Sequence, residues 1–130
     1  MNTKLIMTAS AITLGVAALA FTFIPEEILK LLQLEVSRSL ILLLQIVGAS
    51  YFGFAMLNWM SRNNVIGGIY NKPIAVANFA HFFIGAMALV KALFSNAALS
   101  SLLWLIAIIY LLFAVIFGWL FYKNPSGKKQ

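Results

Sequence analysis

Apolar residues fall into four long runs, at 5–24, 40–60, 74–94 and 102–122, which short polar segments separate. Each run approaches the roughly 20 residues that one membrane-spanning helix requires. The pattern predicts an all-α fold in which residues 1–130 form a single membrane domain. We expect this domain to be an integral membrane four-helix transmembrane bundle.

The segment between the first two runs predicts a fifth, shorter helix. Pro25 ends the first span because proline cannot continue a helix that needs its N–H. Residues 26–35 then place apolar side chains at 28, 31, 32 and 34, which is the spacing of a short amphipathic helix. We expect this helix to lie along the membrane interface between spans one and two.

The first run also carries features of a secretory signal. A basic start leads into an apolar stretch with a small-residue match at 18–20. The apolar run continues beyond that point to Ile24, so we expect a retained helix. Its many Ala, Ser, Thr and Gly residues predict that it packs closely against its neighbours.

The positions of Lys and Arg predict the orientation, because cytoplasmic segments carry the excess of positive charge. With both termini inside, six of the nine basic residues are cytoplasmic: Lys4, Arg62, Lys72, Lys123, Lys128 and Lys129. The outer side holds Lys30, Arg38 and Lys91 with all three acids, Glu26, Glu27 and Glu35. We therefore expect cytoplasmic termini, a disordered cytoplasmic tail at 123–130 and a place in the bacterial inner (plasma) membrane.

Composition supports a lipid environment. Hydrophobic residues make up 63% of the chain and charged residues 9%, which is more apolar surface than a small soluble core could bury. The net charge of +6 comes from basic residues scattered at the ends of the runs, so nucleic acid is not an expected partner. The absence of cysteine excludes disulfides and thiolate metal sites.

Two of the predicted spans carry a stripe of polar and small residues. At about 100° per residue, Gln45, Gly48, Tyr51, Ala55, Asn58 and Arg62 share one face of the second span. Asn78, His81, Gly85, Ala88 and Ala92 share one face of the third. If the stripes face each other, they form a polar seam of Gln45, Tyr51, Asn58, Asn78 and His81 that opens toward the cytoplasm.

Two interpretations of this polar seam remain open. In one, the polar side chains hydrogen-bond between helices, typically for less than about 1–2 kcal/mol each. In the other, they bind a ligand or line a path, with His81 as the group that titrates near neutral pH. Small residues at Gly48, Ala49, Gly53 and Gly85 are expected to let helices pack closely.

The sequence predicts no catalytic residues, metal site or cofactor. His81 has no Cys, Asp or Glu at ligand spacing, and no nucleophile or carboxylate pair accompanies it. An enzyme is therefore disfavoured, although a membrane enzyme that uses His81 and Tyr51 stays among the alternatives.

Three functions remain. The first is binding or transport of a small neutral or anionic solute through the polar seam, by a homo-oligomer. The second is an accessory or scaffold subunit of a larger membrane complex. The third is a lipid- or quinone-binding membrane protein, with His81 and Tyr51 at the polar end of an apolar cleft. Membrane lipid is an expected partner of all three.

In size and layout the chain resembles small four-helix bacterial membrane proteins, including the DoxX-like ones. This resemblance covers no specific motif and assigns no role to any residue.

Overall fold

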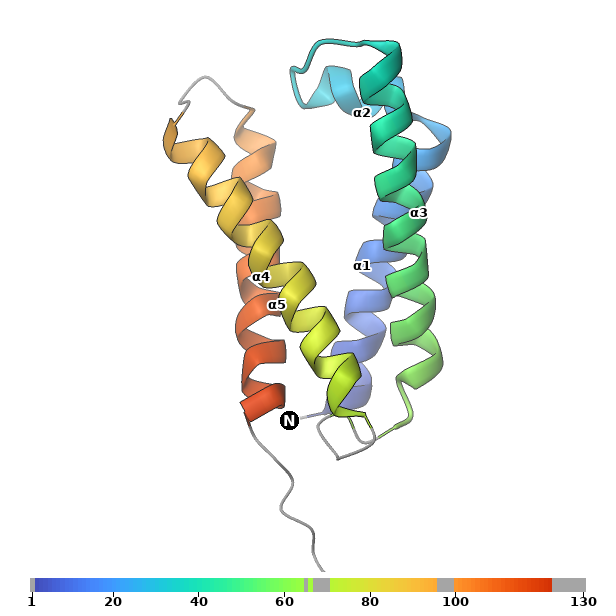
Figure 1. Ribbon diagram of the computed structural model, residues 1–130, viewed down its shortest axis with the longest axis vertical. Helices are drawn as coiled ribbons and strands as arrows, with labels where there is room; N and C mark the ends of the chain where they lie inside the picture. The colour runs from blue at the N-terminus through green and yellow to red at the C-terminus, as the bar shows by residue number, and fades with distance from the viewer. Residues whose placement is uncertain (1, 65, 67–70, 96–99, 123–130) are drawn as a thin grey trace, which may run out of the picture. The chain divides into compact units, whose positions relative to one another are not determined.

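The computed structural model describes residues 2–64, 66, 71–95 and 100–122 (Figure 1). Within this part of the chain the regular structure is helical, without strands: α1 (Thr3–Phe23), α2 (Pro25–Leu31), α3 (Arg38–Ser61), α4 (Lys72–Ser95) and α5 (Ser101–Tyr122). Four of these described helices, all except α2, are long and apolar enough to cross a membrane. The prediction of an all-α membrane protein with four spans and a short helix between the first two is confirmed.

The chain divides into two compact units. The first unit comprises Met1–Arg62 with Ala98–Leu102, and the second comprises Asn63–Ala97 with Leu103–Gln130. The first unit therefore holds α1, α2 and α3, and the second holds α4 and most of α5. The predicted single domain stays a prediction, and the predicted tail lies outside the described residues.

In the first unit, α1 and α3 lie side by side and run in opposite directions (Figure 1). Ser10, early in α1, contacts Asn58 late in α3, and Thr22 late in α1 contacts Gln45 early in α3. The buried side chains of α1 are Met7, Ser10, Ala11, Leu14 and Ala18, which repeat every three or four residues as one helix face. Three small residues of the first run, Ser10, Gly15 and Ala18, thus contact α3, which suits close packing in lipid.

Side-chain caps set where α1 and α3 begin. The Asn2 side chain accepts a hydrogen bond from the Leu5 backbone N–H at 3.3 Å, and the Ser37 hydroxyl accepts one from Leu40 at 3.2 Å. Each cap satisfies a backbone donor that the first turn of a helix leaves without an intrahelical partner. Because of the Ser37 cap, α3 begins at Arg38 and not at the first residue of the apolar run.

The short helix α2 ends earlier than its sequence pattern predicts. Gln33 adopts a left-handed backbone with φ of 59°, and its N–H donates to the Lys30 carbonyl at 3.0 Å. The next N–H, of Leu34, donates to the Leu29 carbonyl at 2.9 Å. This pair of bonds is the Schellman arrangement that terminates helices. Leu29, 2% exposed, anchors the buried side of α2.

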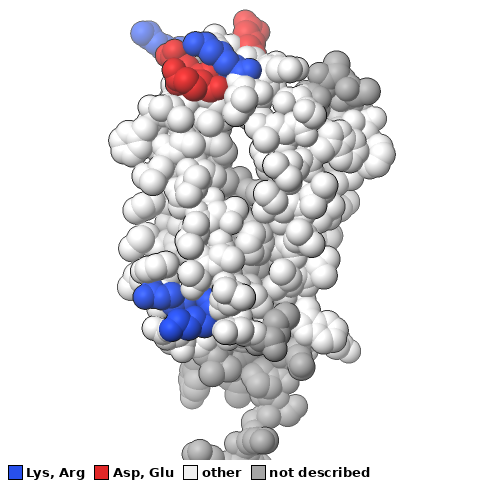
Figure 2. Space-filling model, turned by 180° about the vertical axis from the view of Figure 1, so that it is seen from behind, with Lys and Arg blue, Asp and Glu red and all other residues white. Residues whose placement is uncertain are grey.

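Charged side chains gather at the α2 end of the first unit, where Figure 2 shows acidic and basic groups next to one another. They are Glu26, Glu27, Lys30, Glu35 and Arg38. Because α1 and α3 are antiparallel, Lys4 and Arg62 lie at the other end of the same unit. The Arg62 guanidinium lies 3.9 Å from the Trp59 ring centroid, a cation–π contact at the end of α3.

In the second unit, α4 and α5 are also antiparallel. Phe94, at the end of α4, contacts Trp104 near the start of α5, with ring centroids 5.9 Å apart. At the opposite ends, the Lys72 ammonium lies 5.2 Å from the Phe121 ring. Phe82, fully buried, lies between these two contacts and forms the centre of the core of this unit.

Candidate functional site

A buried polar contact joins α1 to α3 in the first unit. The Asn58 amide nitrogen donates to the Ser10 hydroxyl at 3.0 Å, and that hydroxyl donates to the Met7 carbonyl at 3.0 Å. Asn58 and Ser10 are both 0% exposed. Away from water, a polar group without a partner is costly, so this chain of hydrogen bonds fixes both helices in register.

The other two predicted site residues of α3 also contact α1. The Gln45 amide nitrogen donates to the Thr22 carbonyl at 3.3 Å, near the end of α1. The Tyr51 ring lies tilted against Phe21, with centroids 5.4 Å apart. Gln45, Tyr51 and Asn58 therefore all interact with α1. This arrangement favours the interpretation of these residues as inter-helix contacts.

The small residues predicted for helix packing occupy different surroundings. At Gly48, an added Cβ would lie 2.8 Å from the Thr22 hydroxyl oxygen and 3.1 Å from the Ala18 carbonyl oxygen, so α3 approaches α1 closely there. At Gly53, an added Cβ would meet none of the described atoms within 4 Å. Ala49 is exposed and lines a groove described below.

Asn78 and His81 lie on α4, in the second unit. The Asn78 amide nitrogen donates to the Ile74 carbonyl one turn earlier on the same helix, at 2.9 Å, and Asn78 is 0% exposed. The His81 ring meets Phe82 edge to face at 5.1 Å and Tyr110 of α5 at 5.8 Å. His81 is thus part of an aromatic cluster.

Phe82 is the centre of this aromatic cluster. Its ring stacks on Phe113 at 4.8 Å and on Phe117 at 5.8 Å, and meets Tyr110 edge to face at 5.3 Å. Such ring pairs contribute about 0.5–1.5 kcal/mol each beyond the area they bury. Gly85 makes room for Tyr110, since an added Cβ would lie 2.5 Å from a ring carbon. The cluster is a packing core and leaves His81 among aromatic rings.

The predicted polar seam has its residues in both units. Gln45, Tyr51 and Asn58 belong to the first unit, and Asn78 and His81 belong to the second. In the first unit, Asn58 contacts Ser10 and Gln45 contacts Thr22, two residues that were not predicted as site residues. That the two stripes face each other stays a prediction.

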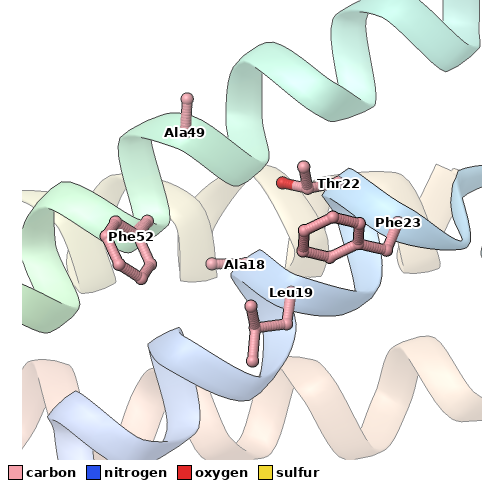
Figure 3. Close-up of a pocket in the computed structure, with 6 residues that line it drawn as sticks. All are labelled: Ala18, Leu19, Thr22, Phe23, Ala49 and Phe52. Atoms are coloured by element: carbon pink, nitrogen blue, oxygen red, sulfur yellow. The ribbon is translucent and has the colours of Figure 1, made fainter.

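A groove runs along the first unit between α1 and α3 (Figure 3). It has a volume of about 360 Å³ and is lined by Ala18, Leu19, Thr22, Phe23, Ala49 and Phe52. Ala18 and Ala49 have only methyl side chains, whereas Leu19, Phe23 and Phe52 are large and exposed. The space therefore exists because Ala18 and Ala49 have small side chains, and the large apolar side chains lie around it.

A second concavity of about 240 Å³ shares Phe52 with this groove. It is lined by Ala11, Ile12, Gly15, Phe52, Ala55, Met56 and Trp59. Both concavities lie between α1 and α3, and the shared phenyl ring makes them neighbours. We call these two neighbouring concavities together the α1–α3 groove.

This groove is not predicted by the pattern of the sequence. Thr22 is the one hydroxyl residue that lines its larger part, and Ala49 and Ala55 stand out in the sequence only as small residues suited to helix packing. The usable signal is a row of small residues at helical spacing on the first span, at Ala11, Gly15 and Ala18, with large apolar residues next to it in the sequence, such as Ile12 and Leu19. Such a row also occurs in ordinary packed helices, so a structure is needed to recognise the groove.

The described residues contain no group of three or more His, Cys, Asp or Glu side chains that could hold a metal ion. Comparison with protein families, curated proteins and solved structures finds no match to this chain. The resemblance to DoxX-like proteins therefore stays one of size and layout. What the structure defines is the class: a membrane protein with four helices of membrane-spanning length.

Proposed function

We propose that this membrane protein binds the long apolar chain of a lipid or quinone in the α1–α3 groove. The observation that carries the proposal is the groove itself, about 360 Å³ in its larger part and lined almost wholly by apolar atoms (Figure 3). Small-molecule sites in proteins have about 300–1,000 Å³ and mostly apolar walls with few polar groups. A flexible hydrocarbon chain matches this shape and chemistry.

Two contacts between α1 and α3 support the proposal. Close approach at Gly48 and the buried Asn58–Ser10 bond hold α1 and α3 together on either side of the groove residues Ala49 and Phe52. A groove between fixed helices requires little ordering when a ligand enters, and preformed sites bind more tightly for that reason.

The test fills the groove without disturbing the helix interface. Ala49 is exposed and lines the groove, so Ala49→Phe adds a ring at the groove wall. Ser50→Phe adds a ring at the neighbouring exposed position, which is not among the groove residues. Native mass spectrometry after extraction in mild detergent measures the lipid or quinone that each protein retains.

We expect the wild type and Ser50→Phe to retain about one amphiphile per chain, and Ala49→Phe to lose most of it. Equal retention by all three proteins would refute the proposal, because the bound molecules would then be ordinary lipid from around the helices. Circular dichroism of both variants checks that the helices are intact.

We propose as a second candidate function the binding or transport of a small neutral or anionic solute by the residues of the predicted polar seam. Two fully buried amides, Asn58 and Asn78, lie within predicted spans, and intramembrane polar residues are often functional. Flux into liposomes tests it with wild type, Asn78→Ala and His81→Ala. If the seam conducts the solute, flux should be lower in both variants than in the wild type. Wild-type flux equal to that of empty liposomes would contradict this function.

We also propose that the protein lies in a bacterial inner membrane with both termini cytoplasmic. With both termini inside, six of the nine basic residues are cytoplasmic, and this excess supports the orientation under the positive-inside rule. Since the chain lacks cysteine, a single Asn2→Cys or Ser39→Cys can be labelled selectively. An impermeant maleimide should label Ser39→Cys in intact cells and Asn2→Cys only after permeabilisation; the reverse result contradicts the orientation.

The homo-oligomer and the accessory role in a larger membrane complex remain proposals as well. Large exposed apolar residues on the membrane-length helices, such as Val115 at 70% and Ile84 at 67%, support contact with lipid or with another helix. The native mass spectra also give the number of chains and any co-purified protein, so a monomer without partner would contradict both.

A further inference from the structure

A third concavity lies where α3 begins, and its chemistry differs from that of the groove. It has a volume of about 410 Å³ and is lined by Arg38, Ser39, Ile41, Leu42 and Gln45. It thus combines a guanidinium, a hydroxyl and an amide with two aliphatic side chains. We call it the Arg38 pocket.

The Arg38 pocket adjoins the α1–α3 groove. Gln45 lines the pocket and Thr22 lines the groove, and the Gln45 amide nitrogen donates to the Thr22 carbonyl at 3.3 Å. At about 100° per residue, Arg38, Gln45 and Ala49 also fall on one face of α3, within roughly 40° of one another. A molecule that occupies the pocket can therefore extend into the groove along a single face of α3.

The depth of the two concavities suits a phospholipid. At about 1.5 Å per residue, Ala49 lies roughly 16 Å along α3 from Arg38, which is close to half of the roughly 30 Å hydrocarbon thickness of a bilayer. With Arg38 at the membrane boundary, the groove at Ala49 is near the middle of the bilayer. A headgroup at Arg38 would thus send its acyl chain into the groove.

The charges at this end indicate the kind of headgroup. Arg38 can bind a phosphate through two parallel N–H donors, which is the strong geometry for this anion. The same end of the unit carries the carboxylates of Glu26, Glu27 and Glu35, against a single further cation, Lys30 (Figure 2). Carboxylates repel a headgroup with net negative charge and attract a protonated amine.

We propose that the Arg38 pocket binds the headgroup of a phospholipid that carries both a phosphate and a protonated amine, such as phosphatidylethanolamine. The phosphate lies on Arg38, the amine faces the carboxylates, and one acyl chain occupies the α1–α3 groove. This inference rests on the proposed function of the groove and adds the class of the headgroup.

The experiment is a competition between two lipids with identical acyl chains. Detergent-exchanged protein is incubated with equal amounts of phosphatidylethanolamine and phosphatidylglycerol, and native mass spectrometry measures the retained ratio. The proteins are wild type, Arg38→Gln, Lys30→Gln and Ala49→Phe. Lys30→Gln is the matched control, because it removes a cation from the same end that does not line the pocket.

We expect the wild type and Lys30→Gln to favour phosphatidylethanolamine by about fivefold, and Arg38→Gln to retain that lipid about fivefold less. Equal retention of both lipids, or a preference for phosphatidylglycerol, overturns the inference. An unchanged result for Arg38→Gln also overturns it.

The outcomes separate this inference from the proposed function. If Ala49→Phe abolishes lipid retention, while Arg38→Gln does not change it and the two lipids are retained equally, the groove binds an acyl chain. Only the headgroup assignment then fails. If neither variant changes retention, the bound lipid is ordinary surrounding lipid and both proposals fail.

Discussion

Replacement of Gly48 by alanine should weaken the first unit, whereas the same replacement at Gly53 should not. Both glycines lie inside α3, so any gain in helix propensity, up to about 1 kcal/mol, is common to the two variants. The two positions differ in the space available for the added methyl group. At Gly53 an added Cβ meets no described atom within 4 Å, whereas at Gly48 it meets α1.

The distances at Gly48 give the size of the effect. The new Cβ would lie 2.8 Å from the Thr22 hydroxyl oxygen and 3.1 Å from both the Ala18 carbonyl oxygen and the Phe21 Cβ. Relaxed contacts between carbon atoms need about 3.5–4.0 Å, so α1 and α3 must move apart by several tenths of an ångström. Overpacking of this kind costs about 1–3 kcal/mol.

The assay is reversible unfolding in mixed detergent micelles, followed by tryptophan fluorescence. We expect the free energy of unfolding of Gly48→Ala to be about 1–3 kcal/mol lower than that of Gly53→Ala. Thr22→Ala in the Gly48→Ala background should recover only part of the loss, because the Ala18 carbonyl belongs to the backbone and cannot rotate away. Equal stability of the two alanine variants would refute the close approach of α1 and α3.

Three further predictions use the same unfolding assay. Ser10→Ala and Asn58→Leu should show a coupling energy of about 0.6–1.7 kcal/mol in a double-mutant cycle, and additive effects would contradict their hydrogen bond. Gln33→Gly should be more stable than Gln33→Ala by about 1 kcal/mol, because φ is 59° there; equal stability would exclude the left-handed conformation. Gly85→Ala should lower the free energy of unfolding by about 1–3 kcal/mol, because its Cβ would clash with two ring carbons of Tyr110. Tyr110→Leu should restore stability, whereas Tyr110→Phe should not, since phenylalanine keeps both ring carbons; equal restoration by both would contradict the contact.

The helices could be predicted from the sequence because length and hydropathy alone determine them. Runs of about 20 apolar residues have few alternatives to a spanning helix. The residues at which the helices begin and end are less predictable. The start of α3 depends on the Ser37 hydroxyl, and the end of α2 depends on Gln33 adopting a conformation that glycine usually supplies.

The partners of the polar residues could not be predicted. Asn58 stands out as an amide inside a span, but its partner Ser10 lies 48 residues away and is one of many small residues in the first run. Helical periodicity identifies which residues share a face and does not show which other helix that face contacts. For that reason the sequence suggested a seam between the second and third spans, whereas the described contacts of Gln45 and Asn58 are with α1.

Photo-cross-linking tests most directly whether the α1–α3 groove holds an acyl chain. A phospholipid with a diazirine on its acyl chain is irradiated with the protein, and labelled residues are mapped by peptide mass spectrometry. The groove residues Leu19 and Phe52 should be labelled several-fold more than Val115 of α5, which is more exposed at 70%, and Ala49→Phe should remove the difference. Labelling that simply follows exposure, with Val115 highest in both proteins, would contradict a binding groove.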